Sequence, residues 1–162
     1  MSLKRRSFLA AVLVAAAVFV TAAAADHGGR GRGHHEPLLQ QRLIGSILAD
    51  QPIHNVTRGS VPWVGKGTAT LERRGRFEVR IRGLLVAGTN NTGPVTTVTV
   101  SLYCAPDSSA AVFTTASAPL SSHGDARIRQ HVAVPSRCLA PVVLVHPNGG
   151  SGAYIMATGF AS

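Results

Sequence analysis

The sequence predicts an all-β domain, an antiparallel sandwich of about seven or eight strands held by one disulfide. Short runs that alternate apolar and polar residues, or that are rich in β-branched residues, recur along the chain. Turn residues separate these runs, and no helical pattern of about ten residues lies between them. The architecture is immunoglobulin-like, but the hallmarks of that family are absent, because Trp63 precedes both cysteines and Tyr103 adjoins the first.

The clearest predicted element is a β-hairpin over residues 67–84, "GTATLERRGRFEVRIRGL", with its turn at residues 73–75. In its second half, apolar and charged residues alternate strictly. Because successive side chains of a strand point to opposite faces of a sheet, we expect one set to be buried and the other exposed. The expected buried set is Phe77, Val79 and Ile81, and the expected exposed set is Arg76, Arg80 and Arg82.

Five further runs predict strands, and breaks rich in Gly, Pro, Ser and Asn separate them. Residues 38–48, "LLQQRLIGSIL", fit a short helix or an entering strand equally well. Residues 50–67 carry two prolines and several glycines and predict a long irregular connection. The five runs are residues 95–104, 111–117, 126–134, 142–147 and 153–160, of which 142–147 is a continuous apolar run that predicts a buried strand.

Residues 1–25 have the features of a secretory signal peptide: a basic start, an apolar run and a small-residue end. We expect cleavage after Ala25; the alternative is a retained membrane anchor, since Phe8–Ala25 is just long enough to span a bilayer. "KRRSFLA" partly matches the twin-arginine export motif, but the very apolar core favours the general secretory route. The predicted location is therefore extracellular or at the cell envelope.

The remainder of the chain predicts two parts. Residues 26–37 are rich in Gly, Arg and His, have no apolar residues to bury, and predict a disordered arm. Residues 38–162 form the predicted β-sandwich domain. The whole sequence has 16 Lys and Arg against 7 Asp and Glu, a formal charge of +9. A basic chain of this kind favours anionic partners.

Cys104 and Cys138 are the only cysteines, and a pair in an exported domain predicts a disulfide. A metal site would need more ligands than two isolated cysteines, and no Cys-x-x-Cys motif exists. A catalytic thiol has no local support in the sequence.

Basic residues on two predicted strands are the candidate binding site. If the strands of residues 76–82 and 126–134 share a sheet, their arginines form one face. The simpler interpretation is that this row is the solvated side of the sheet, with arginine stems covering apolar surface. The other is a face for an anionic cell-wall polymer or lipid headgroups; nucleic acid is disfavoured because no aromatic residues interleave for base stacking. The candidate residues are Arg76, Arg80, Arg82, Arg127 and Arg129.

No motif for catalysis is present: there is neither G-x-S-x-G nor H-E-x-x-H. Glu72 and Glu78 lie on the outward side of the hairpin and are expected to be solvated. Asp50 and Asp125 would have to meet in the fold to act as a carboxylate pair. We expect no cofactor and no bound metal, although cleavage after Ala24 would place His27 third in the chain, where it suits Cu(II) or Ni(II).

These features predict a secreted, non-enzymatic β-domain with a binding or structural role. The alternative is a small extracellular enzyme or metal-binding protein whose site is assembled only in the fold.

Four segments carry a resemblance to small secreted β-rich proteins of high-GC Gram-positive bacteria: "TRGSVPW", "FEVRIRGL", "VTTVTVSLYC" and "CLAPVVLVHPNGGSGAYIMATGF". The resemblance implies secretion and a compact β-domain, and it implies no activity. A weaker likeness is to the CHRD domain. The stretch "GTATLERRGRFEVRIRGL" loosely resembles the opening of that domain, but the His-rich strands typical of it are missing.

Overall fold

The computed structural model describes residues 37–105 and 110–159. These residues form eleven strands, and no helix lies among them, so the predicted all-β class is confirmed. The predicted signal peptide, residues 26–36 of the predicted arm, and Asp107 lie outside the described residues.

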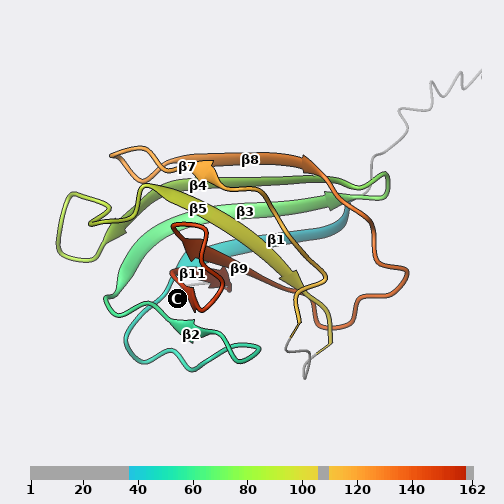
Figure 1. Cartoon of the computed structure of the whole chain (residues 1–162), viewed down its shortest axis with the longest axis horizontal. Helices are drawn as coiled ribbons and strands as arrows, with labels where there is room; N and C mark the ends of the chain where they lie inside the picture. The colour runs from blue at the N-terminus through green and yellow to red at the C-terminus, as the bar shows by residue number, and fades with distance from the viewer. Residues whose placement is uncertain (1–36, 106–109, 160–162) are drawn as a thin grey trace, which may run out of the picture. The chain divides into compact units, whose positions relative to one another are not determined.

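One antiparallel sheet contains nine of the strands, in the order β6-β5-β9-β11-β1-β3-β4-β8, with β7 also paired to β5 (Figure 1). β2 (Thr57–Arg58) and β10 (Ala153–Tyr154) form a separate parallel pair. The strands of the large sheet are β1 (Pro37–Gly45), β3 (Trp63–Glu72), β4 (Arg76–Val86), β5 (Thr97–Tyr103), β6 (Phe113–Thr114), β7 (Ala118–Pro119), β8 (Ala126–His131), β9 (Val142–Pro147) and β11 (Met156–Thr158).

The large sheet curls so that its two ends approach each other around one apolar core. β8, β4, β3 and β1 run side by side in Figure 1, and β5 crosses them obliquely. Phe77 of β4 packs edge-to-face on Phe113 of β6, with ring centroids 4.9 Å apart. Between β6 and β7, the Ala116 amide donates to Gln130 Oε1 of β8 at 2.9 Å. The two layers of the predicted sandwich thus belong to one continuous sheet.

The β3–β4 hairpin confirms the predicted alternation. Phe77, Val79 and Ile81 are at most 2% exposed and belong to the core, whereas Arg76, Arg80 and Arg82 are exposed. The turn lies at residues 73–75, as expected. Its Gly75 has φ +84°, and a Cβ there would come within 2.4 Å of the Val132 carbonyl oxygen, so both backbone and space require glycine.

A β-bulge ends this alternation at Gly83. The register passes from Lys66↔Arg82 to Val64↔Leu85, so β4 carries one residue more than β3 at this point. Gly83 has φ +61°, and its amide donates to Asp125 Oδ1 at 3.0 Å. The extra residue turns Leu84 inward, where it is fully buried. The row of outward cations on β4 therefore stops at Arg82.

Residues 38–48, which fit a helix or a strand by sequence, are mostly strand. β1 lies between β3 and β11, and Leu43 faces Gly67 on one side and Thr158 on the other. Only Leu39 and Leu43 of this strand are buried, and the residues between them point outward or are half-buried.

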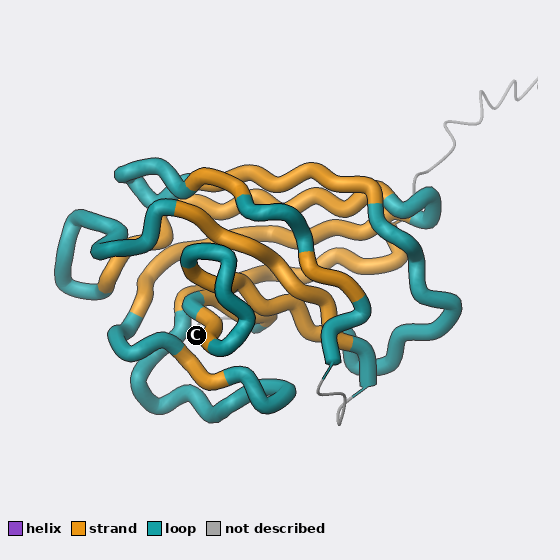
Figure 2. Tube along the Cα trace, viewed as in Figure 1, coloured by secondary structure: helices purple, strands orange, loops and turns teal. Residues whose placement is uncertain are grey.

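A second apolar cluster covers the outer side of β5, β9 and β11. Along β9, Val143 and Val145 join the main core, whereas Leu144 packs on the opposite side. The connection of residues 46–62 folds over this opposite side, shown as the lower loops in Figure 2, and buries Val56 against it. This connection is irregular apart from β2, as predicted, but it ends before Trp63, and residues 63–67 of the predicted irregular stretch belong to β3 instead. The buried cluster is Val56, Tyr103, Leu144, Tyr154 and Ala157.

The disulfide joins Cys104 to Cys138, which confirms the predicted pair. Cys104 follows β5, and Cys138 lies in the connection between β8 and β9. Beside it, the Ala105 amide donates to the Leu139 carbonyl at 2.6 Å. The disulfide therefore ties the connection between β8 and β9 to the end of β5.

Candidate functional site

The five predicted site arginines lie on one surface. β4 pairs with β8 so that Arg80 faces Arg127 and Glu78 faces Arg129. Each of the five arginines is exposed, on the side of the sheet opposite the core. The condition set by the sequence, that the two strands share a sheet, is therefore met.

Two further cations join this surface, and the sequence interpretation missed both. The pairing of β1, β3 and β4 places Arg42 opposite Thr68 and Lys66 opposite Arg82. Both side chains are exposed. The outward side of β1, β3, β4 and β8 is named the cationic face here; its cations are Arg42, Lys66, Arg76, Arg80, Arg82, Arg127 and Arg129, and its acids are Glu72 and Glu78.

Glu78 is not the solvated carboxylate that the sequence suggested. Its side chain is only 16% exposed, because four guanidinium groups surround it. The hydrogen bond from Arg80 holds the pKa of the Glu78 carboxyl below its usual value, and the charges of Arg80 and Arg129 act in the same direction. The N···O distances to Glu78 are 3.7 Å from Arg76, 2.7 Å from Arg80, 2.6 Å from Arg127 and 3.5 Å from Arg129.

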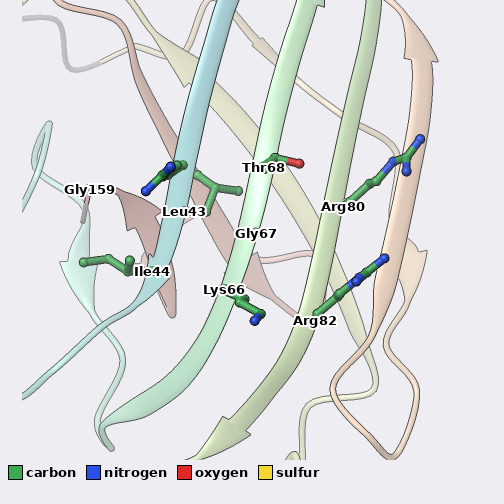
Figure 3. Close-up of a pocket in the computed structure, with 9 residues that line it drawn as sticks. Leu43, Ile44, Lys66, Gly67, Thr68, Arg80, Arg82 and Gly159 are labelled. Carbon is green, nitrogen blue, oxygen red and sulfur yellow. The ribbon is translucent and has the colours of Figure 1, made fainter. Parts of the chain in front are cut away.

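The other three cations of the face, Arg42, Lys66 and Arg82, make no ion pair within the described ranges. They line a groove of about 530 Å³ together with Arg80 and Thr68. Figure 3 shows Lys66 and Thr68 on β3 beside Arg82 and Arg80 on β4. No carboxylate of the described residues lines the groove, and of its four cations only Arg80 has an ion-pair partner, Glu78.

A second depression of about 230 Å³ adjoins the groove and shares Thr68 and Arg80 with it. Its floor continues along β3 through Thr70 to Glu72, and Glu78 lines its wall. The furrow follows β3 because the outward threonines of this strand are much shorter than the arginines of β4. Its two ends differ in charge: four cations and no acid line the first depression, whereas two acids and two arginines line the second.

The carboxylates of the enzyme alternative do not form a pair. Asp50 Oδ2 accepts a hydrogen bond from the Ile47 amide at 2.8 Å, within one turn. Asp125 Oδ1 accepts from the Gly83 amide at the bulge. Asp50 thus stabilises a local turn, and Asp125 joins the segment before β8 to the bulge in β4. In the part of the chain that the structure describes, no three His, Cys, Asp or Glu side chains gather as a metal site would require.

A serine–histidine pair lies under the covered side of the sheet, and no sequence motif marked it. His146 Nδ1 is 2.8 Å from the Ala153 carbonyl, which only accepts, so Nδ1 carries the proton. Nε2 then accepts from Ser101 Oγ at 3.0 Å. Both residues are fully buried, and burial lowers the pKa of His146. With no exposed surface, the pair acts as an internal hydrogen-bonded link between β5, β9 and β10.

Aromatic side chains are absent from the cationic face as described. Trp63, Phe77, Tyr103 and Tyr154 are each at most 4% exposed, and Phe113 is half-buried. Stacking on nucleic-acid bases needs exposed rings. This face therefore offers charge, hydrogen bonding and the aliphatic side chains of Leu38 and Ile44, and no exposed aromatic ring among the described residues.

Comparison of the chain with protein-family models, with curated proteins and with solved structures finds no match. Among the described residues, no helix is long and apolar enough to cross a membrane.

Proposed function

We propose that this protein binds an extended anionic polymer through the cationic face, outside the cell or at the cell envelope, and that it does so without catalysing a reaction. One observation carries the proposal: seven cations and two acids lie on an open face of the same sheet whose other half is covered by the chain itself. A fold that covers one half with its own connection leaves the other half free for a partner.

The shape of the face favours a polymer chain over a membrane surface. The two adjoining depressions form a furrow along β3, which suits a linear ligand. Proteins that bind in the membrane interface typically insert Trp, Phe or Leu beside their basic residues. The aromatic residues of the described chain are buried or half-buried instead, and of its exposed leucines only Leu38 lies on a strand of the cationic face.

The location proposed for this binding rests on the signal-peptide pattern of residues 1–25 and agrees with the disulfide. An anionic polymer of the cell wall is the partner that such a location supplies. The resemblance to secreted β-rich proteins supports the same setting.

Retention of the purified protein on isolated anionic cell-wall polymer, anionic vesicles and double-stranded DNA, each at low and at high salt, tests the proposal. We expect retention on the polymer that falls steeply as salt rises, because surface charges are screened within about 10 Å at 0.1 M salt. No retention on the polymer at low salt would contradict the proposal. Stronger retention on vesicles or on DNA than on the polymer would contradict it as well.

A further inference from the structure

Like charges face each other at two places on the cationic face, and only one of them is neutralised. Arg80 lies directly opposite Arg127, and Glu78 Oε1 is within 2.9 Å of nitrogen atoms from both. Lys66 lies directly opposite Arg82, and no carboxylate of the described residues pairs with either. Because like charges directly opposite on neighbouring strands repel, the Lys66–Arg82 pair lacks a counter-charge that the other pair has.

Thr68 lies among the cations of the groove. Across the sheet it has Arg42 on one side and Arg80 on the other. Along β3, Lys66 is two residues away on the same face, about 7 Å distant. Its hydroxyl lines the floor of the groove of about 530 Å³. Cations from three strands thus line the same groove as Thr68, and Figure 3 shows Thr68 on β3 between Lys66 on the same strand and Arg80 on β4.

We propose that this groove is a phosphate subsite, in which Arg42, Lys66 and Arg82 hold one phosphate group of the polymer. The Thr68 hydroxyl donates to the same group. A phosphate presents several oxygens in a tetrahedral arrangement, which donors on three different strands can reach, whereas a carboxylate has two coplanar oxygens. Guanidinium groups also bind phosphate oxygens in pairs. This proposal rests on the proposed function and narrows its ligand.

The adjoining depression constrains the part of the ligand that lies next to the phosphate. Thr70, Glu72 and Glu78 line it together with Arg76 and Arg80, which are already ion-paired with these two acids. A second phosphate there would therefore meet two carboxylates and no unpaired cation of the described residues. Hydroxyl groups instead would donate to those carboxylates. The ligand class that fits both ends is a polyol or sugar chain joined by phosphodiesters, lying along β3 with one phosphate at Lys66 and hydroxyl-bearing units toward Glu72.

The test compares Lys66→Gln and Arg82→Gln with Arg129→Gln as a matched control. Each variant removes one positive charge from the same face, but Arg129 lies outside the groove, beside Glu78. The probes are fluorescently labelled poly(glycerol phosphate) and polygalacturonate of equal charge, measured by anisotropy across a salt series. We expect each groove variant to lose about tenfold in affinity for poly(glycerol phosphate), and to lose about one unit of salt slope for one lost phosphate contact. The control should lose about twofold or less.

Each failure has its own signature. If the wild-type protein binds neither polymer, the proposed function and the subsite both fail. If it binds but all three variants weaken it equally, the face acts diffusely, and the subsite alone is wrong. Equal binding of polygalacturonate would contradict the choice of phosphate. If Lys66→Gln and Arg82→Gln weaken only binding to phosphatidylglycerol vesicles, the bound phosphate belongs to a lipid headgroup, and the proposal of a polymer ligand is wrong.

Two measurements separate binding from folding. Arg82→Lys keeps the charge and should restore most of the affinity that Arg82→Gln loses. In the wild-type protein, titration with inorganic phosphate should shift the amide resonances of Gly67 and Thr68 and leave His146 unchanged. Shifts spread evenly over β8 would contradict the subsite.

Discussion

The two halves of the large sheet are built alike on the inside and oppositely on the outside. Both halves send valine, leucine and isoleucine into one core. Outside, β5, β9 and β11 carry Tyr103, Leu144 and Ala157 under the connection of residues 46–62, whereas β1, β3, β4 and β8 carry arginine, lysine and threonine in the open. Polar residues on a strand can therefore have two roles. Ser101 and His146 form a buried hydrogen bond between strands, whereas Arg82 is exposed and available to a partner.

The largest expected loss of stability comes from a substitution in the covered half of the sheet. Tyr154 is fully buried, and its hydroxyl donates to the Gln51 carbonyl at 2.8 Å, which ties the connection to the sheet. Tyr154→Ala should lower the free energy of unfolding by about 3–5 kcal/mol, through lost burial and a cavity. A urea melt measures this, with Tyr154→Phe as the control that removes only the hydrogen bond. If Tyr154→Ala and Tyr154→Phe lower the free energy of unfolding equally, packing of the aromatic ring does not stabilise the connection on the sheet.

The second prediction compares the two sides of one strand. Val79 is fully buried, and Val79→Ala should cost about 1–3 kcal/mol through lost burial and a cavity. Arg82 is exposed and unpaired within the described residues, so Arg82→Ala should stay within about 0.5 kcal/mol. Denaturant melts of both variants decide the point. A larger loss for Arg82→Ala would show that its side chain supports the fold.

The third prediction concerns acid. Burial lowers the pKa of His146, so the unfolded chain takes up a proton at a higher pH than the folded one. Stability from the neutral ring is fully present above the ordinary value near 6.5, and it declines as pH falls below that value. One proton limits this loss to about 1.4 kcal/mol per pH unit. Urea midpoints should fall in the wild-type protein between about pH 7.5 and about pH 5.5, on either side of the ordinary histidine value.

His146→Asn is the control for this titration, since the asparagine amide does not titrate. Its midpoint should depend less on pH over the same range than that of the wild-type protein. Equal slopes in the two proteins would assign the acid sensitivity to another group.

The smallest expected effect concerns the centre of the cationic face. Glu78→Gln removes the counter-charge of four arginines and should cost about 1 kcal/mol at low salt, since exposed ion pairs are individually weak. The loss should shrink in about 1 M NaCl, where salt screens the repulsion that remains. Melts at the two salt concentrations measure it. A loss that does not change with salt would indicate packing instead of charge.

The positions of the strands, and the residues that each strand buries, could be predicted from the sequence because both follow from alternation of apolar and polar residues. The burial of Phe77, Val79 and Ile81 follows from a period of two, and the disulfide follows from having one pair of cysteines. Alternation also places the five arginines outward, and it would have marked Arg42 between Leu39 and Leu43 had residues 38–48 been taken as a strand.

The groove could not be predicted, because it depends on strand order and register. Lys66 faces Arg82 in the register that the hairpin turn sets, but Arg42 reaches Thr68 only because β1 inserts beside β3. The neutralising role of Glu78 depends on β8 arriving from 49 residues away to place Arg127 against it. Sequence alternation assigns a side chain to a face, and its neighbours on that face come from the tertiary fold.

The position of β1 determines the order in which the sheet can be completed. β1 is the first described strand, yet its partner on one side is β11, and the Leu43↔Thr158 pairing joins distant parts of the chain. A chain that emerges from a ribosome or a translocation channel with its N-terminal end first can form the β3–β4 hairpin early, since that pairing is local. It leaves one side of β1 without a partner until residues 156–158 arrive. The pairing of β1 with β11 therefore cannot form before residues 156–158 have emerged, and until then one edge of β1 is open to chaperones, proteases and other copies of the chain.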